Sequence, residues 1–138
     1  MKSDQKMKQI LFDVAVTEND KILKKNIDEG KLTIFSENEF IFAYTCRGTI
    51  VNVECIRPMP KGTQKRYMES ALNKLNEETG LEKYFVSEVE GKKFFNMSLL
   101  YVIQTEEDDK IKEEASYLTK YVKEQAQDSF NKLLPPAK

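Results

Sequence analysis

The chain has 138 residues, with 22 Lys and Arg against 23 Asp and Glu, a net charge of −1, no His and two Cys. Without His it lacks a catalytic imidazole and a His metal ligand, and two Cys cannot form an all-cysteine zinc site or a disulfide framework. No stretch approaches the roughly 18 apolar residues that cross a bilayer. The composition therefore excludes several classes of enzyme, metalloprotein and membrane protein.

Length and composition indicate one small cytoplasmic domain. We expect a single domain over residues 1–138, with residues 1–8 and 135–138 flexible. The polar N-terminus lacks the pattern of a secretory signal, so both Cys are expected to stay reduced. Lys outnumbers Arg by nineteen to three, which is typical of an AT-rich genome such as that of a low-GC bacterium, its plasmid or a phage.

The N-terminal region is predicted to contain a helix, preceded by an ambiguous segment. Residues 9–16 fit both a strand and a helix, because their apolar residues satisfy either periodicity. Thr17 then has the position of a helix N-cap, and Gly30 has that of a helix stop. We therefore expect a helix over 18–29, to which a helical segment 7–16 could be joined.

Three strands are predicted next, and two of them form a hairpin. Residues 32–36 form the first strand. A turn at Arg47 and Gly48 gives the other two a register in which the apolar residues share one face: Tyr44 with Val51, Phe42 with Val53, and Phe40 with Cys55. A slip of one residue would destroy this match. In this register Cys46 and Cys55 lie far apart, which argues against a disulfide between them.

Two further helices are predicted. One covers 63–79, after a loop at 57–62 in which two Pro remove ladder donors; its buried stripe is Tyr67, Met68, Ala71, Leu72 and Leu75. The other is long and has an acidic first turn that suits the helix dipole. Thr105 caps it, Pro135 and Pro136 end it, and its stripe is Ile111, Ala115, Leu118, Val122, Ala126, Phe130 and Leu133.

A second hairpin lies between these helices. Its strands, 82–90 and 93–103, turn at Glu90 and Gly91, and one face pairs Val86 with Phe95, Tyr84 with Met97, and Glu88 with Lys93. Residues 93–103 become apolar on both faces, so we expect a central strand that is covered on both sides. Together the elements predict an α+β fold with an antiparallel sheet of about five strands, in the order α-βββ-α-ββ-α.

No motif in the sequence points to a catalytic, cofactor-binding or metal site. No His can act as base for a Cys nucleophile, and the five Gly form no phosphate-binding loop. A basic cluster near aromatic residues nevertheless carries the ingredients of single-stranded DNA binding. The candidate residues are Phe40, Phe42, Tyr44, Arg47, Arg57, Lys61, Lys65 and Arg66. The simpler interpretation is that the rings belong to the core and the basic loop is solvated.

The opposite face of the first hairpin is another candidate surface. It carries a small apolar patch mixed with polar residues: Ile41, Ala43, Ile50, Asn52 and Glu54. Half-apolar faces of this kind are common dimer or partner surfaces.

The order of elements between Glu29 and Leu134 resembles the YbjN-like family, whose fold is that of the type III secretion chaperones. The resemblance rests on Glu29–Ile34 before the strands, on the helix segment Ala71–Asn76, on the strand Lys83–Val86 and on the long closing helix. It implies a non-enzymatic, often dimeric, protein-binding module. It contributes no catalytic residue.

A rival resemblance is to the OB-fold, because three strands, a helix and two strands are also the order of that barrel. It implies that exposed rings on the first hairpin stack on single-stranded DNA. The long acidic C-terminal helix favours the first resemblance, since its apolar stripe needs an open sheet. We therefore expect a cytoplasmic protein-binding module, chaperone-like or regulatory, homodimeric and without a cofactor. The alternative is a small OB-fold single-stranded DNA-binding protein from a plasmid or phage.

Overall fold

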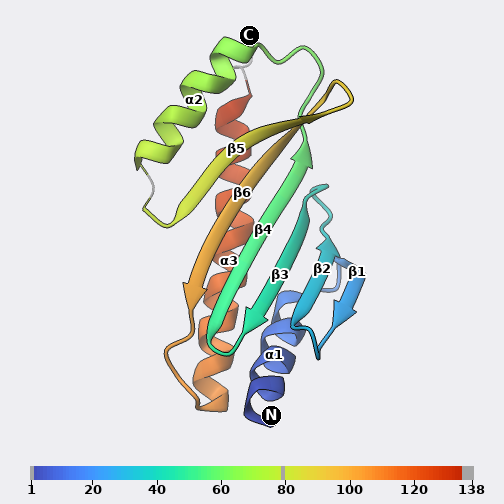
Figure 1. Cartoon of the computed structure of the whole chain (residues 1–138), viewed down its shortest axis with the longest axis vertical. Helices are drawn as coiled ribbons and strands as arrows, with labels where there is room; N and C mark the ends of the chain where they lie inside the picture. Colours follow the sequence, from blue (N-terminus) through green and yellow to red (C-terminus); the bar gives the residue numbers. More distant parts are fainter. Residues whose placement is uncertain (1, 79, 135–138) are drawn as a thin grey trace.

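The computed structural model describes residues 2–78 and 80–134, which form three helices and six strands (Figure 1). The helices are α1 (Lys2–Ala15), α2 (Lys65–Glu78) and α3 (Asp108–Leu133). The strands are β1 (Lys21–Asn26), β2 (Lys31–Phe35), β3 (Ile41–Arg47), β4 (Ile50–Pro58), β5 (Glu82–Val89) and β6 (Lys92–Val102). The expected α+β class and the long C-terminal helix are confirmed, with six strands in place of about five.

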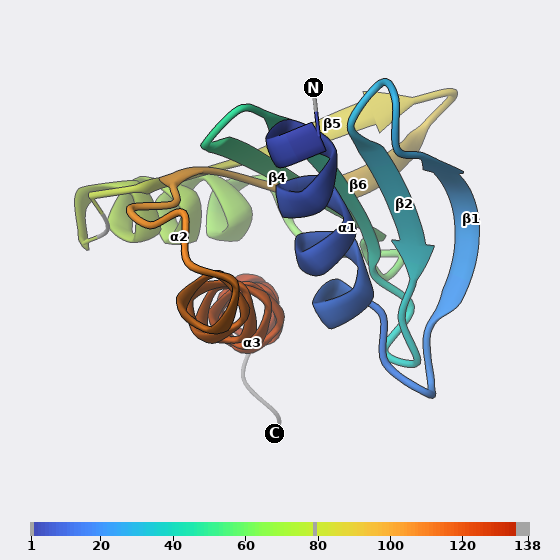
Figure 2. The same cartoon turned by 90° about the horizontal axis from the view of Figure 1, so that it is seen from below.

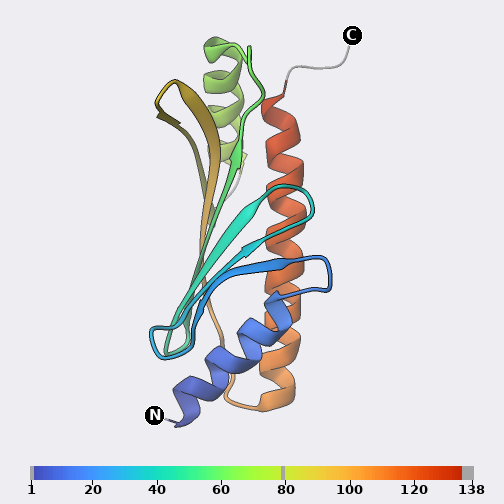
Figure 3. The same cartoon turned by 90° about the vertical axis from the view of Figure 1, so that its right-hand side faces the viewer.

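All six strands belong to one antiparallel sheet in the order β1-β2-β3-β4-β6-β5. The helices α1 and α3 lie on one side of this sheet, and no helix of the described residues lies over the other side (Figure 3). Seen from below, the sheet twists strongly and its β1–β2 end curves around α1 (Figure 2). Because β1 and β5 are free edges of an open sheet, the OB-barrel resemblance is wrong.

The helix expected over 18–29 is wrong, because this segment contains the edge strand β1. The residues that resembled a helix cap form a turn instead: the Asp20 carboxylate accepts a hydrogen bond from the Thr17 N–H at 3.0 Å. Lys123 of α3 binds the same carboxylate at 2.7 Å and fixes the turn against the core. The helix lies earlier in the chain. Its buried residues Leu11, Phe12 and Ala15 follow helical spacing, which resolves the ambiguity of residues 9–16.

The ends of the chain were expected to be flexible. Residues 2–8 form the first two turns of α1, in which the Met7 side chain is buried. Residues 135–138, including the two Pro expected to end the last helix, lie outside the described residues.

The first hairpin has the predicted face but not the predicted register. Arg47 pairs with Ile50, and Tyr44 pairs with Val53 rather than Val51, so the strands are shifted by two residues. Gly48, with φ of 59°, opens the two-residue turn, where type I′ and II′ turns need a positive φ. A two-residue shift keeps the same side chains on the same face, because side chains alternate with a period of two.

The second hairpin has the predicted register. Its pairs include Tyr84 with Met97, Val86 with Phe95, and Glu88 with Lys93. Glu90 and Gly91 both have positive φ, 51° and 80°, as a type I′ turn requires. β6 lies inside the sheet between β4 and β5, but helices cover only one of its sides. Leu100 and Val102 on the other side are 57% and 41% exposed, so the expectation of cover on both sides is wrong.

The predicted stripe of α3 packs on the sheet, and all of its seven residues are buried. The helix begins later than expected. Glu107 is its N-cap residue, and the Thr105 hydroxyl accepts a hydrogen bond from the Glu107 N–H at 3.1 Å. The stripe meets the apolar face of the hairpins, where the Phe130 ring contacts Phe40 and Phe95 edge-on at 5.7 and 5.6 Å between centroids. These rings form the centre of the core.

Helix α2 protects the free edge of the sheet. Of its predicted stripe, Met68 and Leu75 are buried and the other three residues are half-buried. The Asn76 side chain forms two hydrogen bonds with the backbone of Tyr84 in β5, one from each of its polar atoms, at 3.0 and 2.9 Å. The side chain thus takes the place of a neighbouring strand and blocks pairing with another chain at this point. β4 extends to Pro58, so the expected loop begins only at Met59.

Candidate functional site

The three aromatic candidates for DNA stacking are core residues. Phe40, Phe42 and Tyr44 are each 1% exposed, under the helices. Burial also raises the pKa of the Tyr44 phenol above its usual value. A base cannot stack on a ring that is already covered by protein. The structure therefore does not provide the exposed platform that the DNA-binding hypothesis requires.

The basic candidates are not brought together. Arg57 is a packing residue: its guanidinium lies 4.2 Å from the Phe130 ring centroid and 3.3 Å from a Glu39 carboxylate oxygen. Lys61, Lys65 and Arg66 are exposed on the β4–α2 loop and the first turn of α2. Arg47 is the last residue of β3 and pairs with Ile50 at the start of the nine-residue strand β4, so it lies about 25–30 Å from Pro58 at the other end of that strand, by strand rise.

The two thiols are structural. Cys46 and Cys55 are buried, and each lies on the helix-covered face of the first hairpin. Burial raises the pKa of Cys55 to about 12, so its thiol is protonated at neutral pH. A protonated, buried thiol is a small apolar side chain, as the sequence suggested.

A buried polar cluster that sequence reasoning missed joins β5 to α3. The Tyr84 hydroxyl lies 3.0 Å from the Ser129 hydroxyl and accepts a hydrogen bond from Gln125 at 3.1 Å. Next to it, the Tyr121 hydroxyl donates to the buried Glu82 carboxylate. Burial raises the pKa of Tyr84, and its hydrogen bonds oppose that shift. The spacing of Gln125 and Ser129 on one face of a helix was the available signal. The cluster fixes the edge strand to the helix.

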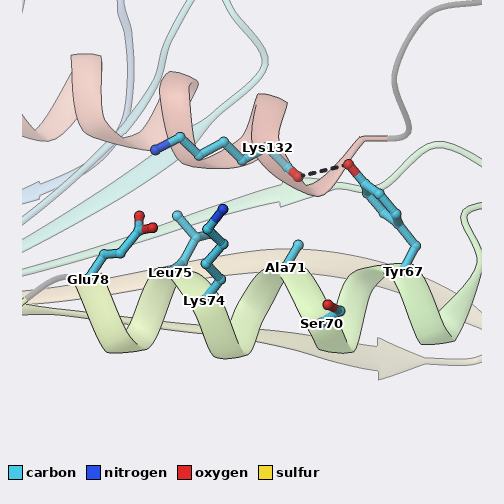
Figure 4. Close-up of a pocket in the computed structure, with 7 residues that line it drawn as sticks. All are labelled: Tyr67, Ser70, Ala71, Lys74, Leu75, Glu78 and Lys132. Carbon is cyan, nitrogen blue, oxygen red and sulfur yellow. Dashed lines mark hydrogen bonds between the residues drawn. The ribbon is translucent and has the colours of Figure 1, made fainter.

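A groove of about 410 Å³ separates α2 from the C-terminal end of α3 (Figure 4). The Tyr67 hydroxyl closes one end by donating to the backbone carbonyls of Lys132 and Leu134, at 3.4 and 2.9 Å. Ala71 and Leu75 form an apolar floor, with lysines on both helices. The described lining residues include no thiol or imidazole.

The side of the sheet without helices is the most distinctive surface of the molecule, and we call it the open face. It consists of the residues of β2–β6 that point away from α1 and α3. Five strands contribute large apolar side chains to it: Phe35, Ile41, Ile50, Ile56, Phe85, Val89, Leu100 and Val102. Phe85, Leu100 and Ile50 are 51%, 57% and 48% exposed. This surface extends the half-apolar patch that the sequence predicted on the first hairpin.

A shallow hollow of about 250 Å³ lies in the middle of the open face. Ile41, Ala43 and Ile56 form one wall, and Phe85 lies at the other. The Asn96 side chain between them donates to the Ser87 hydroxyl at 2.9 Å, so this amide is satisfied within the sheet. Polar side chains of Glu54, Asn96 and Ser98 also line the hollow, so its lining is mixed, and it has the size of a few side chains.

Two of the charged residues on the open face flank β6. Glu54 on β4 pairs with Ser98 on β6, and Lys83 on β5 pairs with the same serine from the other side. Both charged side chains are exposed, and neither forms an ion pair with another described residue. They are free to interact with whatever covers the face.

The described residues contain no cluster of three or more potential metal ligands among His, Cys, Asp and Glu. In the same part of the chain, none of the helices combines the length and hydropathy that a membrane span requires.

Comparisons with known proteins support a shared fold. No protein family matches the chain, and no curated protein matches it in sequence. Among solved structures, the chain is similar to YbjN from E. coli, a proposed transcription regulator, with a TM-score of 0.55. The similarity covers 93% of this chain and 86% of that one, at 9% sequence identity. The expected resemblance to YbjN is therefore confirmed for the fold alone.

Proposed function

We propose that this chain is a non-enzymatic, cytoplasmic binding module that holds other polypeptides on its open face. The main observation behind this proposal is that the helices cover only one of the two sides of the sheet. Helices bury one side of the sheet, while the other presents the half-exposed side chains of Phe85, Leu100 and Ile50 and a shallow hollow. Exposed apolar surface of this extent, rimmed by polar groups, is typical of a protein-binding site.

Two further observations support a binding role. The buried, protonated thiol of Cys55 offers no nucleophile at neutral pH. The similar structure, YbjN, is a proposed transcription regulator, and regulation by protein contact needs a surface of this kind. A chaperone-like role would use the same surface to bind unfolded segments, whose apolar side chains would pack on a half-apolar sheet face.

The test is suppression of aggregation. The full chain is mixed with a reporter enzyme that aggregates on heating, and light scattering is followed at increasing molar ratio. We expect scattering to fall by at least about half at a twofold excess of the chain over the reporter. A variant with Phe85→Ser, Leu100→Ser and Val102→Thr should lose this effect, because it removes apolar surface only from the open face.

The matched control removes exposed apolar groups elsewhere. Leu81 and Tyr117 are 66% and 63% exposed and lie outside the open face, so Leu81→Ser with Tyr117→Ser should suppress aggregation as the wild type does. Circular dichroism confirms that both variants stay folded. Absence of suppression by the wild type, or equal loss in both variants, would refute binding at the open face.

A further inference from the structure

Two rows of side chains on the open face cross β6. One row of side chains across the sheet runs Glu54, Ser98, Lys83, so the acid and the base flank β6, each one strand away, at about 4.8 Å per strand. The adjacent row runs Ile56, Asn96, Phe85 in the same strand order. In each row, the groups on the two sides of β6 complement each other, in charge or in apolar character.

We infer that the open face binds a second copy of this chain through a twofold axis along β6; this rests on the proposed function, because it names an occupant for the same surface. A half-turn about an axis parallel to β6, midway between two facing sheets, places β4 of one copy over β5 of the other. Glu54 then faces the partner's Lys83, and Lys83 faces the partner's Glu54. A twofold interface repeats each such contact.

The apolar residues fit the same axis. Ile56 on β4 faces the partner's Phe85, so each half-exposed ring is placed over the hollow of the other copy. Leu100 is on β6 itself and lies beside the axis, where it meets the partner's Leu100. This contact covers the Leu100 side chain, which is 57% exposed in the single chain. One twofold rotation therefore places each Phe85 ring over a hollow and each Glu54 opposite a Lys83.

The area of the overlap indicates a weak, transient pair. An axis along β6 superposes three strands, β4, β6 and β5, which span about 14 Å across and about 30 Å along, from strand spacing and rise. Each copy therefore offers about 400–450 Å², about half of the roughly 800 Å² per partner of a standard interface. Because the same face serves the proposed polypeptide binding, self-association would compete with it, and suppression of aggregation per chain should fall as the concentration of the chain rises.

The test uses charge reversal and mixing, with the full chain in sedimentation velocity from about 1 to 100 µM. We expect the wild type to dimerise. Glu54→Lys and Lys83→Glu should each raise the dimer dissociation constant at least tenfold, because each creates two like-charge contacts. An equimolar mixture of the two variants should dimerise again, because a mixed pair regains two contacts of opposite charge. Lys120→Glu on the exposed side of α3 is the control and should dimerise as the wild type does.

Each outcome of these experiments supports or refutes one part of the inference. A wild type that is monomeric at 100 µM overturns the self-association, while the proposed function survives if aggregation is still suppressed. If both charge reversals leave the dimer intact, the interface is not the open face. If the mixture of the two variants stays monomeric, the copies are not related by the twofold axis along β6. Leu100→Lys serves as a second dimer-breaking variant should either reversal fail to fold. A dimer without suppression of aggregation would leave self-association standing and refute the proposed function.

Discussion

Both sides of strand β4 carry β-branched apolar residues, yet helices cover only one of the two sides. On one side Val51, Val53 and Cys55 are 0–2% exposed beneath the helices. On the other, Ile50 is 48% exposed, and Glu54 is exposed as well. What separates the two sides is the partner: the apolar stripe of α3 covers one side, and no described element covers the other. The difference teaches that cover of a sheet face is a tertiary property, which alternation along one strand does not determine.

The largest effect should come from a charge on the covered side. Val53→Asp buries an unpaired carboxylate and should destabilise the fold by about 3–5 kcal/mol. In the monomer, at about 1 µM or below, the matched change on the open face, Val102→Asp, should cost less than about 1 kcal/mol, because that side chain is 41% exposed. Urea unfolding measures both. Similar losses in the two variants would show that the open face is covered in solution. Together the two variants test which face of the sheet the helices cover. A register shift of two residues would not change the expected result, because it keeps the same side chains on the same face.

A second, smaller effect tests how tightly the covered side is packed. Gly30 has φ of 67°, and a Cβ on it would lie 2.1 Å from the Cys46 carbonyl oxygen. Gly30→Ala should therefore cost about 3 kcal/mol, from backbone strain and from the displacement of β3. Gly48 has φ of 59° but nothing within 4 Å of such a Cβ. Gly48→Ala should cost about 1 kcal/mol, and thermal unfolding should rank the two in this order.

Because the covered side excludes water, we expect the free energy of unfolding to fall at alkaline pH. The pKa of Cys55 rises from its usual 9.0 to about 12, so the folded state holds the proton more tightly than the unfolded state does. Its contribution is complete below pH 9 and is lost as the pH rises from 9 to 12. At pH 10.5 the wild type should have lost about 2 kcal/mol more than Cys55→Ala, relative to pH 8. Equal losses in urea titrations would mean that water reaches this thiol.

Much of the fold could be read from local signals. The register of the second hairpin followed from Glu90 and Gly91, since both residues adopt the positive φ of a tight turn. The stripe of α3 followed from helical spacing. Strand β1 could not be read, because a strand exposed on both sides shows no alternation, and its sequence resembles a capped helix. The contact that fixes its start, between Asp20 and Lys123, spans 103 residues.

The candidate site was predictable only in part. The half-apolar patch of Ile41, Ala43 and Ile50 was visible from the first hairpin alone. Its extension to Phe85 and Leu100 required the placement of β6 beside β4, which is a contact between distant segments. The same placement decides that the rings of Phe40, Phe42 and Tyr44 face α3 rather than a ligand. Sequence alternation identified the two sides but could not assign the helices to either of them.

The smallest expected effect concerns single-stranded DNA. With the rings of Phe40, Phe42 and Tyr44 at 1% exposure, only scattered lysines and arginines remain to attract phosphates, and these give weak, salt-sensitive binding. Fluorescence anisotropy of labelled poly-dT should show a dissociation constant above about 100 µM at about 150 mM salt. The combined change Lys61→Ala, Lys65→Ala and Arg66→Ala should alter stability by less than about 0.5 kcal/mol, because all three are exposed. Tight binding that this variant or Arg47→Ala abolishes would restore the nucleic-acid hypothesis, and it would require a ligand surface other than the buried rings.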